Sequence, residues 1–197
     1  NLGDIVSGPL LPAETAALLI ELDLPTIRGN HERQLLETPR AKMGASDGFA
    51  HDALRPSQFD WLRKLPASME LGSDVLLCHG TPESDLVLLL ETLDGGNPRA
   101  ATVEEVQSRL EGVTHGLILC GHTHIQRTVC LDDGRLVLNP GSVGLPAYED
   151  LNPYPHRVET GTPQARYAIA DNASGAWQAQ LRSVDYGYSA MSELAAR

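Results

Sequence analysis

The sequence predicts an α/β fold, because strand and helix patterns alternate over its first 120 residues and hairpin patterns dominate afterwards. Hydrophobic residues make up 42% of the 197 residues, a share typical of a globular chain rather than a disordered one. The length suits one domain with a substantial core, and no internal repeat is visible. We therefore expect a single α/β domain over residues 1–197, whose later strands pair antiparallel.

The first 65 residues alternate short apolar runs with helical patterns. Pro12 stands in the first turn of one candidate helix, and Ser57 with Asp60 occupies the S-x-x-D capping positions of another. Residues 40–55 show little periodicity and are expected to form a loop. In chain order we expect a strand end at 2–6, a helix at 12–22, a strand at 26–28 and helices at 32–37 and 57–65.

Hairpin patterns characterise the remainder of the chain. A T-x-x-E capping box, formed by Thr102 and Glu105, opens its clearest helix. Residues 86–90 form an apolar run that periodicity does not assign, and the length of the run favours a strand. Further strands are expected at 68–71, 74–78, 116–120, 128–131, 136–138, 167–170 and 177–181, a surface excursion at 148–163, and a helix from 189.

The charge balance argues against an extended nucleic acid as partner. The chain has 26 acidic and 15 basic residues, a net charge of −11, and no basic run. No apolar stretch approaches the roughly twenty residues that a membrane-spanning helix needs, so we expect no membrane partner. Cys78, Cys120 and Cys130 are odd in number and lack CxxC spacing, which fits buried free thiols and a cytoplasmic location.

Polar residues that can bind metals repeatedly follow short apolar runs. Asp4 follows Leu2-Gly3, and His79 follows residues 75–78. Because open α/β sheets gather their ligands beyond the carboxyl ends of the strands, such residues are expected to converge on one edge. The full set is Asp4, Asn30, His31, His79, His122 and His124.

This set predicts a centre for first-row divalent metals. It offers a carboxylate, an amide oxygen and imidazoles without a thiolate, which suits manganese, iron, zinc or nickel better than calcium or a structural zinc site. The two imidazoles of G-H-T-H can serve two adjacent ions if the chain turns there, which implies a dinuclear centre. Taken singly, each residue has a plainer interpretation as a turn or surface residue, and that interpretation is kept for His51, His115 and His156.

Five motifs, in this order along the chain, resemble those of the calcineurin-like metallophosphoesterases. GNHE and GHTH together, with a histidine between them, are quite specific. The motifs are GDIVSG (3–8), GNHE (29–32), CHG (78–80), GHTH (121–124) and NPGSVG (139–144). The resemblance implies a sandwich of two mixed β-sheets flanked by helices, with a two-metal site at the strand ends.

The same resemblance implies a ligand set. Asp4 is similar to the carboxylate that bridges both metals, and His124 is similar to a ligand of the first metal. Asn30, His79 and His122 resemble the ligands of the second metal. The expected cofactors are two divalent ions, Mn²⁺, Fe²⁺/Fe³⁺, Zn²⁺ or Ni²⁺, which together acidify a bridging water to the attacking hydroxide.

His31 is similar to the family's histidine that contacts the phosphate and protonates the leaving oxygen. It is therefore the expected general acid, and Glu32 or a backbone carbonyl is expected to orient its ring.

The chain departs from the family pattern at its beginning. The family carries a D-x-H motif upstream of the GD motif, which gives the first metal an aspartate and a histidine, whereas here nothing precedes Asn1-Leu2. Of the usual ligands of the first metal only Asp4 and His124 remain. We expect the chain to be N-terminally incomplete, lacking the first strand and helix, and the intact gene to encode D-x-H upstream.

The branch of the family follows from two details. Ser7 and Gly8 stand where protein phosphatases have the last positions of GDxVDRG, and GHTH within one loop favours the small prokaryotic phosphodiesterase-like branch. The expected activity is hydrolysis of a small phosphodiester or phosphomonoester, with nucleotides among the candidate substrates. The alternatives are a related protein or dinucleotide polyphosphate phosphatase and a non-catalytic scaffold of the same fold.

Overall fold

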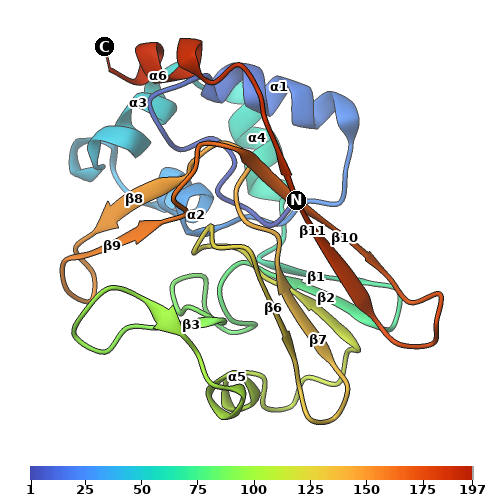
Figure 1. Ribbon diagram of the computed structural model, residues 1–197. Coiled ribbons are helices and arrows are strands. Elements are labelled where there is room, and N and C mark those ends of the chain that lie inside the picture. The colour runs from blue at the N-terminus through green and yellow to red at the C-terminus, as the bar shows by residue number, and fades with distance from the viewer. Residues whose placement is uncertain (197) are drawn as a thin grey trace. The chain divides into compact units, whose positions relative to one another are not determined.

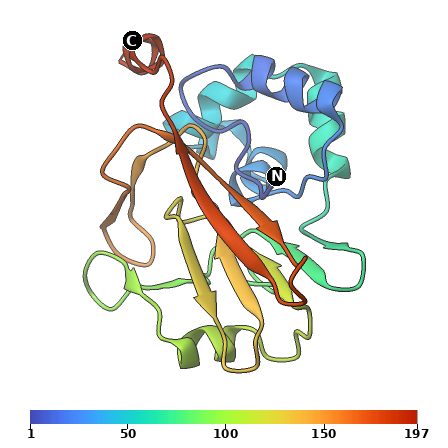
Figure 2. The same cartoon turned by 45° about the vertical axis from the view of Figure 1, so that its right-hand side comes forward.

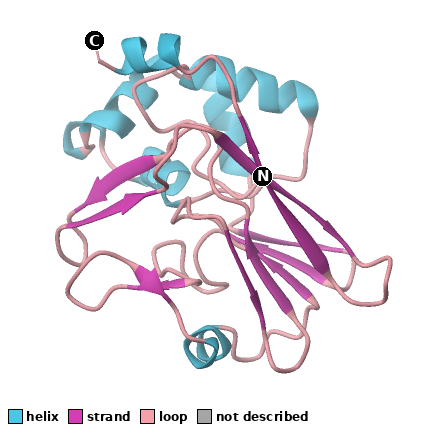
Figure 3. Cartoon of the chain, viewed as in Figure 1, coloured by secondary structure: helices cyan, strands magenta, loops and turns pink. Residues whose placement is uncertain are grey.

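The structure, a computed structural model, describes residues 1–196 and divides into two compact units (Figure 1). Unit 1 consists of Asn1–Ser68 and the C-terminal segment that begins at Gly187, and unit 2 consists of Met69–Tyr186. The cartoon coloured by secondary structure shows that unit 1 is built from helices and loops, whereas most strands belong to unit 2 (Figure 3). The α/β class predicted from the sequence is confirmed.

Unit 1 consists of short helices, four of which contribute buried residues to a small apolar core. Helix α1 begins at Pro12 as predicted, and it ends where Asp23 adopts a left-handed conformation with a φ of 46°. The core contains Val6, Ala16, Leu35, Ala50, Leu54, Leu62 and Leu65. The helices are α1 (Pro12–Leu22), α2 (Asn30–Glu37), α3 (Ala45–Ala53), α4 (Pro56–Lys64) and α6 (Ser189–Ala195), with a 3₁₀ helix at Arg40–Lys42.

The two strands predicted in unit 1 are not formed, which corrects the assignments at 2–6 and 26–28. In the first segment, positive φ angles at Gly3 and Asp4 break the extended conformation, and the N–H of Ile5 donates to a side chain instead of a strand. In the second, Ile27 and Arg28 donate to the carbonyls of irregular segments. Backbone N–H groups that already donate hydrogen bonds in this way do not require a neighbouring strand as partner.

Residues 40–55 are largely helical, which corrects the loop expected there. Helix α3 carries Gly48 in its interior, and a Cβ at this position would lie 2.8 Å from Nη1 of Arg40. The close approach of Arg40 explains why position 48 has no side chain. A glycine inside a helix also lowers the local helix propensity. The helix is maintained by tertiary packing, since Ala50 is fully buried in the core of unit 1.

Unit 2 contains a mixed five-stranded sheet in the order β1-β2-β5-β7-β6. Strand β5 pairs parallel with β2 and with β7, and β6 pairs antiparallel with β7. The strands are β1 (Ser68–Leu71), β2 (Val75–Cys78), β5 (Leu117–Leu119), β6 (Arg127–Cys130) and β7 (Leu136–Asn139). The hairpin predicted for the last two strands is confirmed.

The two faces of this sheet are covered differently. Ile118 and Val137 pack on one face with Leu89, Leu90 and Val106, the last of which belongs to α5 (Val103–Arg109). On the other face the antiparallel hairpin β10 (Ala165–Asp171) and β11 (Gln178–Val184) forms a second layer (Figures 1 and 2). Its small side chains, Ala168, Ala170 and Ala179, pack with Trp177 on Leu117, Leu136 and Leu138.

Two short hairpins complete unit 2. The apolar run 86–90 is irregular rather than a strand, and the strand β3 (Glu91–Thr92), paired with β4 (Arg99–Ala100), begins just after it. The excursion at 148–163 contains most of a second hairpin, β8 (Ala147–Asp150) with β9 (His156–Glu159).

The cysteines are free, as expected, but only two of them are buried. Cys78 and Cys120 lie in the core of unit 2, where burial raises the pKa of Cys78 to about 12, whereas Cys130 is exposed. Within residues 1–196 no helix combines the length and the apolar character needed to span a membrane.

Candidate functional site

The predicted site residues are divided between the two units: Asp4, Asn30 and His31 belong to unit 1, and His79, His122 and His124 to unit 2. Within unit 1, the structure brings the GD turn beside the start of α2. The N–H of His31 donates to Oδ1 of Asp4 over 3.1 Å, and Asn30, the first residue of the helix, is 5% exposed. The two turns that carry these residues are therefore packed against each other.

Glu32 holds these two turns together through its fully buried carboxylate. Oε2 accepts from the N–H of Asp4 at 2.7 Å and from that of Gly29 at 2.8 Å, and Oε1 accepts from Ile5 at 2.7 Å. Burial and the negative charge of Asp4 raise the pKa of Glu32, and these backbone donors oppose the shift. Hydrogen bonds from backbone N–H groups to a carboxylate are among the stronger kinds, so the turn geometry depends on this side chain.

The GD turn also requires its glycine. Gly3 has a φ of 88°, and a Cβ built on it would lie 2.3 Å from the backbone N of Gly29. An ordinary side chain would therefore collide with the next motif along the chain, in addition to adopting an unfavourable conformation. This contact explains in physical terms why a glycine precedes Asp4.

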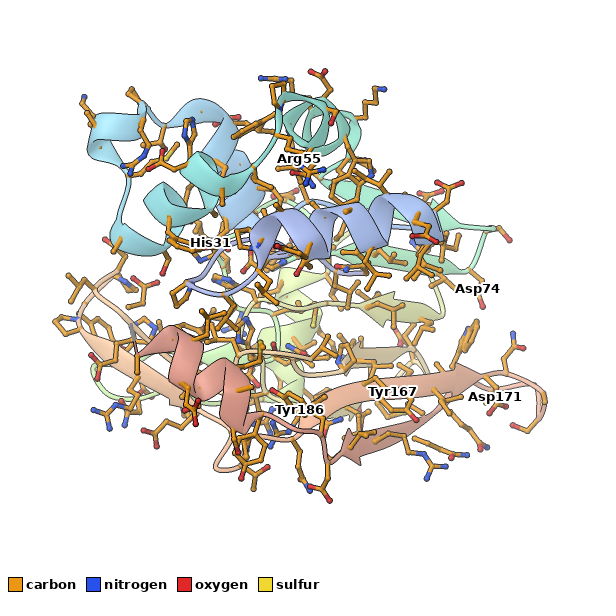
Figure 4. The ribbon with its side chains drawn as sticks, turned by 90° about the horizontal axis from the view of Figure 1, so that it is seen from above. His31, Arg55, Asp74, Tyr167, Asp171 and Tyr186 are labelled. Carbon is orange, nitrogen blue, oxygen red and sulfur yellow. The ribbon has the colours of Figure 1, made fainter. Side chains whose placement is uncertain are left out.

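The ring of His31 is held by Asp47 of α3, a residue that the sequence patterns do not single out. Nδ1 of His31 and Oδ1 of Asp47 are 2.8 Å apart, and the hydroxyl of Ser7 donates to the same carboxylate oxygen over 2.8 Å. The expectation that Glu32 or a backbone carbonyl orients His31 is wrong, because Glu32 binds backbone N–H groups and Asp47 binds the imidazole. His31 lies among the helices of unit 1 (Figure 4).

The environment of His31 favours its charged form. Burial lowers the pKa of the imidazole, but the hydrogen bond to Asp47 and the charges of Asp4, Asp47 and Glu32 outweigh burial and raise the pKa to about 9. Burial raises the pKa of Asp47, but the hydrogen bond and charge of His31 and the hydrogen bond from Ser7 outweigh burial. The pKa of Asp47 is therefore lowered. In the metal-free chain the pair is therefore an imidazolium with a carboxylate at neutral pH.

His79 and His122 lie side by side in unit 2. Their ring centroids are 5.1 Å apart with an interplanar angle of 57°, and His79 is only 2% exposed. His79 directly follows β2, and its carbonyl accepts the N–H of Gly121, which precedes His122, over 2.8 Å. The sheet thus brings two histidines that are 43 positions apart in the sequence into contact at the ends of β2 and β5, as the edge argument predicted.

The GHTH turn contains two left-handed residues. His122 and His124 have φ angles of 64° and 60°, and Asp4 has a φ of 54°. Within residues 1–196, Asp23 is the one further non-glycine residue with a positive φ, so three of the four are predicted ligands. Such conformations cost about 1–3 kcal/mol each and are concentrated at functional sites.

Asn139 of the NPGSVG motif, fully buried at the end of β7, stabilises this turn. Its side-chain amide donates to the carbonyl of Gly121 at 2.7 Å and to Oγ1 of Thr123 at 3.0 Å. The NPGSVG motif therefore supports the GHTH turn through a side chain.

Tyr148 and Leu145 fix the ring of His124. Nδ1 of His124 lies 2.9 Å from the carbonyl of Leu145, so this nitrogen carries the hydrogen and Nε2 holds the lone pair of the neutral ring. The ring of Tyr148 contacts that of His124 edge to face at 5.1 Å, and its hydroxyl donates to the carbonyl of His122 at 3.2 Å. Sequence reasoning missed Tyr148, which lies in the predicted surface excursion.

The donor chemistry fits divalent first-row metals. Carboxylate, amide and imidazole groups are present at turns that form hydrogen bonds with buried side chains, and His124 has its tautomer set by a backbone carbonyl, as metal-binding histidines commonly do. The three histidines outside this set have ordinary partners. His51 contacts Asp52, His115 contacts Glu70, and His156 contacts the carbonyl of Tyr154.

Comparisons with known proteins agree with the fold and the motifs. Residues 1–161 match the family model of the calcineurin-like phosphoesterase superfamily domain. A metallophosphoesterase from Sphaerobacter thermophilus superimposes with a TM-score of 0.69 at 20% identity, over 98% of this chain and 80% of that one. The hypothetical protein PH1004 from Pyrococcus horikoshii gives a TM-score of 0.71 at 17% identity, over 97% and 76%.

A search of curated proteins gives no significant match. At these identities the two solved structures show the fold, and the family follows from the domain model, which covers well over half of the chain. The chain belongs to the calcineurin-like phosphoesterase superfamily.

Proposed function

We propose that this protein hydrolyses small phosphodiesters or phosphomonoesters, nucleotides among them, with two divalent cations. Membership of the superfamily implies metal-dependent hydrolysis of phosphate esters. The observation that carries the proposal for this chain is the left-handed backbone at Asp4, His122 and His124, three residues of the predicted ligand set. Strain of this kind is retained where a function requires the geometry.

In the proposed centre Asp4 would serve both cations. Asn30, His79 and His122 would hold one of them, and His124 would contribute to holding the other. The adjacent rings of His79 and His122 support the assignment of both to one ion, and the Nδ1 contact of His124 leaves its Nε2 as the ligand atom. When bound, the cations lower the pKa of a water molecule and neutralise the phosphoryl oxygens.

His31 is proposed as the general acid. With Nδ1 engaged by Asp47, the proton on Nε2 is the one that can be delivered to the leaving oxygen. An imidazole that stands beside two carboxylates keeps this proton in the metal-free chain, since its pKa is raised to about 9. His31 directly follows Asn30 at the start of α2, so the proposed acid and a proposed ligand are neighbours in the chain.

Metal analysis and a diester assay test the proposal together. The purified protein is expected to bind manganese and to cleave bis-p-nitrophenyl phosphate in a manganese-dependent reaction. His122→Ala should lose metal and activity, whereas His31→Ala should keep its metal and hydrolyse an alkyl phosphate ester, whose leaving group needs a proton, more slowly. His51→Ala is the matched control, because His51 pairs with Asp52 and is outside the proposed centre.

A protein that binds no manganese and cleaves neither the diester nor p-nitrophenyl phosphate would contradict the enzyme assignment. That result would favour the scaffold alternative. If His31→Ala and His122→Ala lost metal equally, the division between ligand and general acid would be wrong.

A further inference from the structure

Three segments of unit 1 meet at one carboxylate oxygen. Oδ1 of Asp47, on the first turn of α3, lies 2.8 Å from Nδ1 of His31 on α2 and accepts a hydrogen bond of 2.8 Å from the hydroxyl of Ser7, which follows the GD turn. The side chain of Asp47 is 12% exposed and that of His31 is 36% exposed. The contact is therefore half-buried and fixed by a third group, unlike an ordinary surface ion pair.

We propose that Asp47, supported by Ser7, is a positioning residue that holds His31 in the orientation and tautomer required to protonate the leaving group. This inference rests on the proposed function, which supplies the reaction in which His31 acts. Asp47 lies outside the five motifs and in a segment whose sequence shows no periodic pattern, so the structure alone assigns this role.

The chemistry of the pair supports this role. An ionised carboxylate only accepts hydrogen bonds, so Nδ1 of His31 must carry hydrogen in both protonation states of the ring. The exchangeable proton is then on Nε2. A neutral histidine without such a partner distributes its proton between both nitrogens and rotates about its side-chain bonds, which misplaces the donor.

The proposed step is hydrolysis of a P–O bond with proton transfer to the leaving oxygen. An oxygen of water forms a bond to phosphorus, and its proton passes to solvent. The bond from phosphorus to the leaving oxygen breaks, and that oxygen takes the proton from Nε2 of His31. The ring remains neutral with its Nδ1–H on Asp47, and a proton from solvent restores the imidazolium.

Ser7 gives Asp47 a second anchor. Its hydroxyl donates to the same Oδ1 that accepts from the imidazole, which restricts rotation of the carboxylate. Since Ser7 stands three residues after Asp4, the proposed bridging ligand and the anchor of the general acid belong to one turn. Removing the hydroxyl should loosen the pair without removing the charge.

The test compares leaving groups that differ in their need for a proton. A p-nitrophenolate leaves unprotonated near neutral pH, whereas an alkoxide does not. Asp47→Ala should therefore lower kcat for an alkyl phosphate ester by roughly 10²-fold, the lower end of a general-acid contribution, and change kcat for the p-nitrophenyl ester by less than about threefold. Ser7→Ala should give a smaller loss with the same selectivity, and KM should be little changed in both.

Asp52→Ala is the matched control, since Asp52 lies on the same helix and pairs with Arg40 on the surface. It should leave both substrates unaffected. Asp47→Asn, which keeps one acceptor oxygen and loses the charge, should fall between wild type and Asp47→Ala. Manganese content should match wild type in every variant compared, and each variant should remain folded at the assay temperature.

A second readout needs no metal and no turnover. Nitrogen-15 NMR of the metal-free protein, recorded where the ring is neutral, should show His31 with its hydrogen on Nδ1. Asp47→Ala should shift the ring toward the Nε2–H tautomer that unpartnered histidines favour. The signals of His51 provide an internal reference.

Equal losses on both leaving groups, or an unchanged His31 tautomer in Asp47→Ala, would overturn the inference. If wild type cleaves no phosphate ester, the proposed function fails and the tautomer measurement still decides whether Asp47 positions the ring. If wild type is active and Asp47→Ala is indistinguishable from it, the positioning role fails and the proposed function stands.

Discussion

The backbone N–H of Asp4 donates to the carboxylate of Glu32 over 2.7 Å, at a side chain that is fully buried. Removing a carboxylate from water is unfavourable, and here the cost is offset by backbone donors from two turns. The relationship makes Glu32 the group that sets the position of Asp4 relative to the start of α2. The same hydrogen bonds explain why residues 2–6 form no strand, since the N–H groups of Asp4 and Ile5 donate to a side chain.

Replacing Glu32 by Gln should destabilise the protein. Gln keeps one acceptor oxygen but brings an NH₂ group against backbone donors, so at least one buried N–H loses its partner. We expect a loss of about 2–4 kcal/mol in the free energy of unfolding, measured by urea denaturation. Glu37→Gln, an exposed position on the same helix, should change the free energy by less than about 0.5 kcal/mol. Similar values for both variants would contradict the role assigned to Glu32.

Gly3 and Gly8 form a matched pair for testing the close approach of the two turns. Both have a positive φ, 88° and 124°, but a Cβ at Gly3 would meet Gly29 at 2.3 Å, whereas one at Gly8 would meet nothing within 4 Å. Gly3→Ala should therefore lose more stability than Gly8→Ala, by about 2 kcal/mol or more, because the backbone of Gly29 cannot move aside cheaply. Thermal or urea unfolding of the two variants measures the difference, and equal losses would mean that conformational strain alone accounts for the glycine.

Capping and turn chemistry predicted many of the elements correctly. The box of Thr102 and Glu105 opens α5, and Asp132, Asp133 and Gly134 separate the hairpin strands β6 and β7. These signals are local, so the sequence contains them in full. The sequence did not predict helix α3, because this segment has little hydrophobic periodicity and an interior glycine that lowers helix propensity. The helix is stabilised instead by packing partners that are distant in the sequence.

The approach of two histidines that follow strands was predictable from the motifs. His79 and His122 were expected to approach each other, and their rings are in contact. Asp47 and Tyr148 were not predictable, because each acts on a motif histidine from a segment without periodic pattern. Such partners are brought by tertiary structure, and no short-range spacing encodes them. The assembly of all six predicted residues into one centre stays a prediction.

The pair of His31 and Asp47 should make the stability of the metal-free protein depend on pH. The pKa of His31 is raised from 6.5 to about 9, so the folded state holds a proton that the unfolded state has lost between these values. The contribution is complete below about pH 6.5, falls as the pH rises, and is lost above about pH 9. Urea unfolding in the presence of a chelator measures this slope.

Asp47→Asn supplies the control for the pH dependence. Without the carboxylate the pKa of His31 should move toward 6.5, and the decline in stability between pH 6.5 and 9 should flatten. Direct NMR titration of His31 in both proteins checks the same shift. A wild-type pKa near 6.5 would show that burial cancels the effect of the neighbouring carboxylates.

Tyr148 should strengthen metal binding by stabilising the GHTH turn. Its hydroxyl donates to the carbonyl of His122, and its ring packs against that of His124. Tyr148→Phe keeps the ring contact and removes the hydrogen bond, so the left-handed turn loses one restraint. Because partners of metal ligands typically contribute 10–100-fold to affinity, we expect the manganese Kd to rise by roughly tenfold.

The matched variant is Tyr167→Phe, at an exposed tyrosine on the β10–β11 hairpin (Figure 4). It should leave the manganese Kd unchanged, as measured by calorimetry under the same conditions. At saturating manganese, Tyr148→Phe should recover most of the wild-type kcat, since the hydroxyl acts on the turn and not on the phosphate. A loss of kcat that excess metal does not restore would instead place Tyr148 in contact with the substrate.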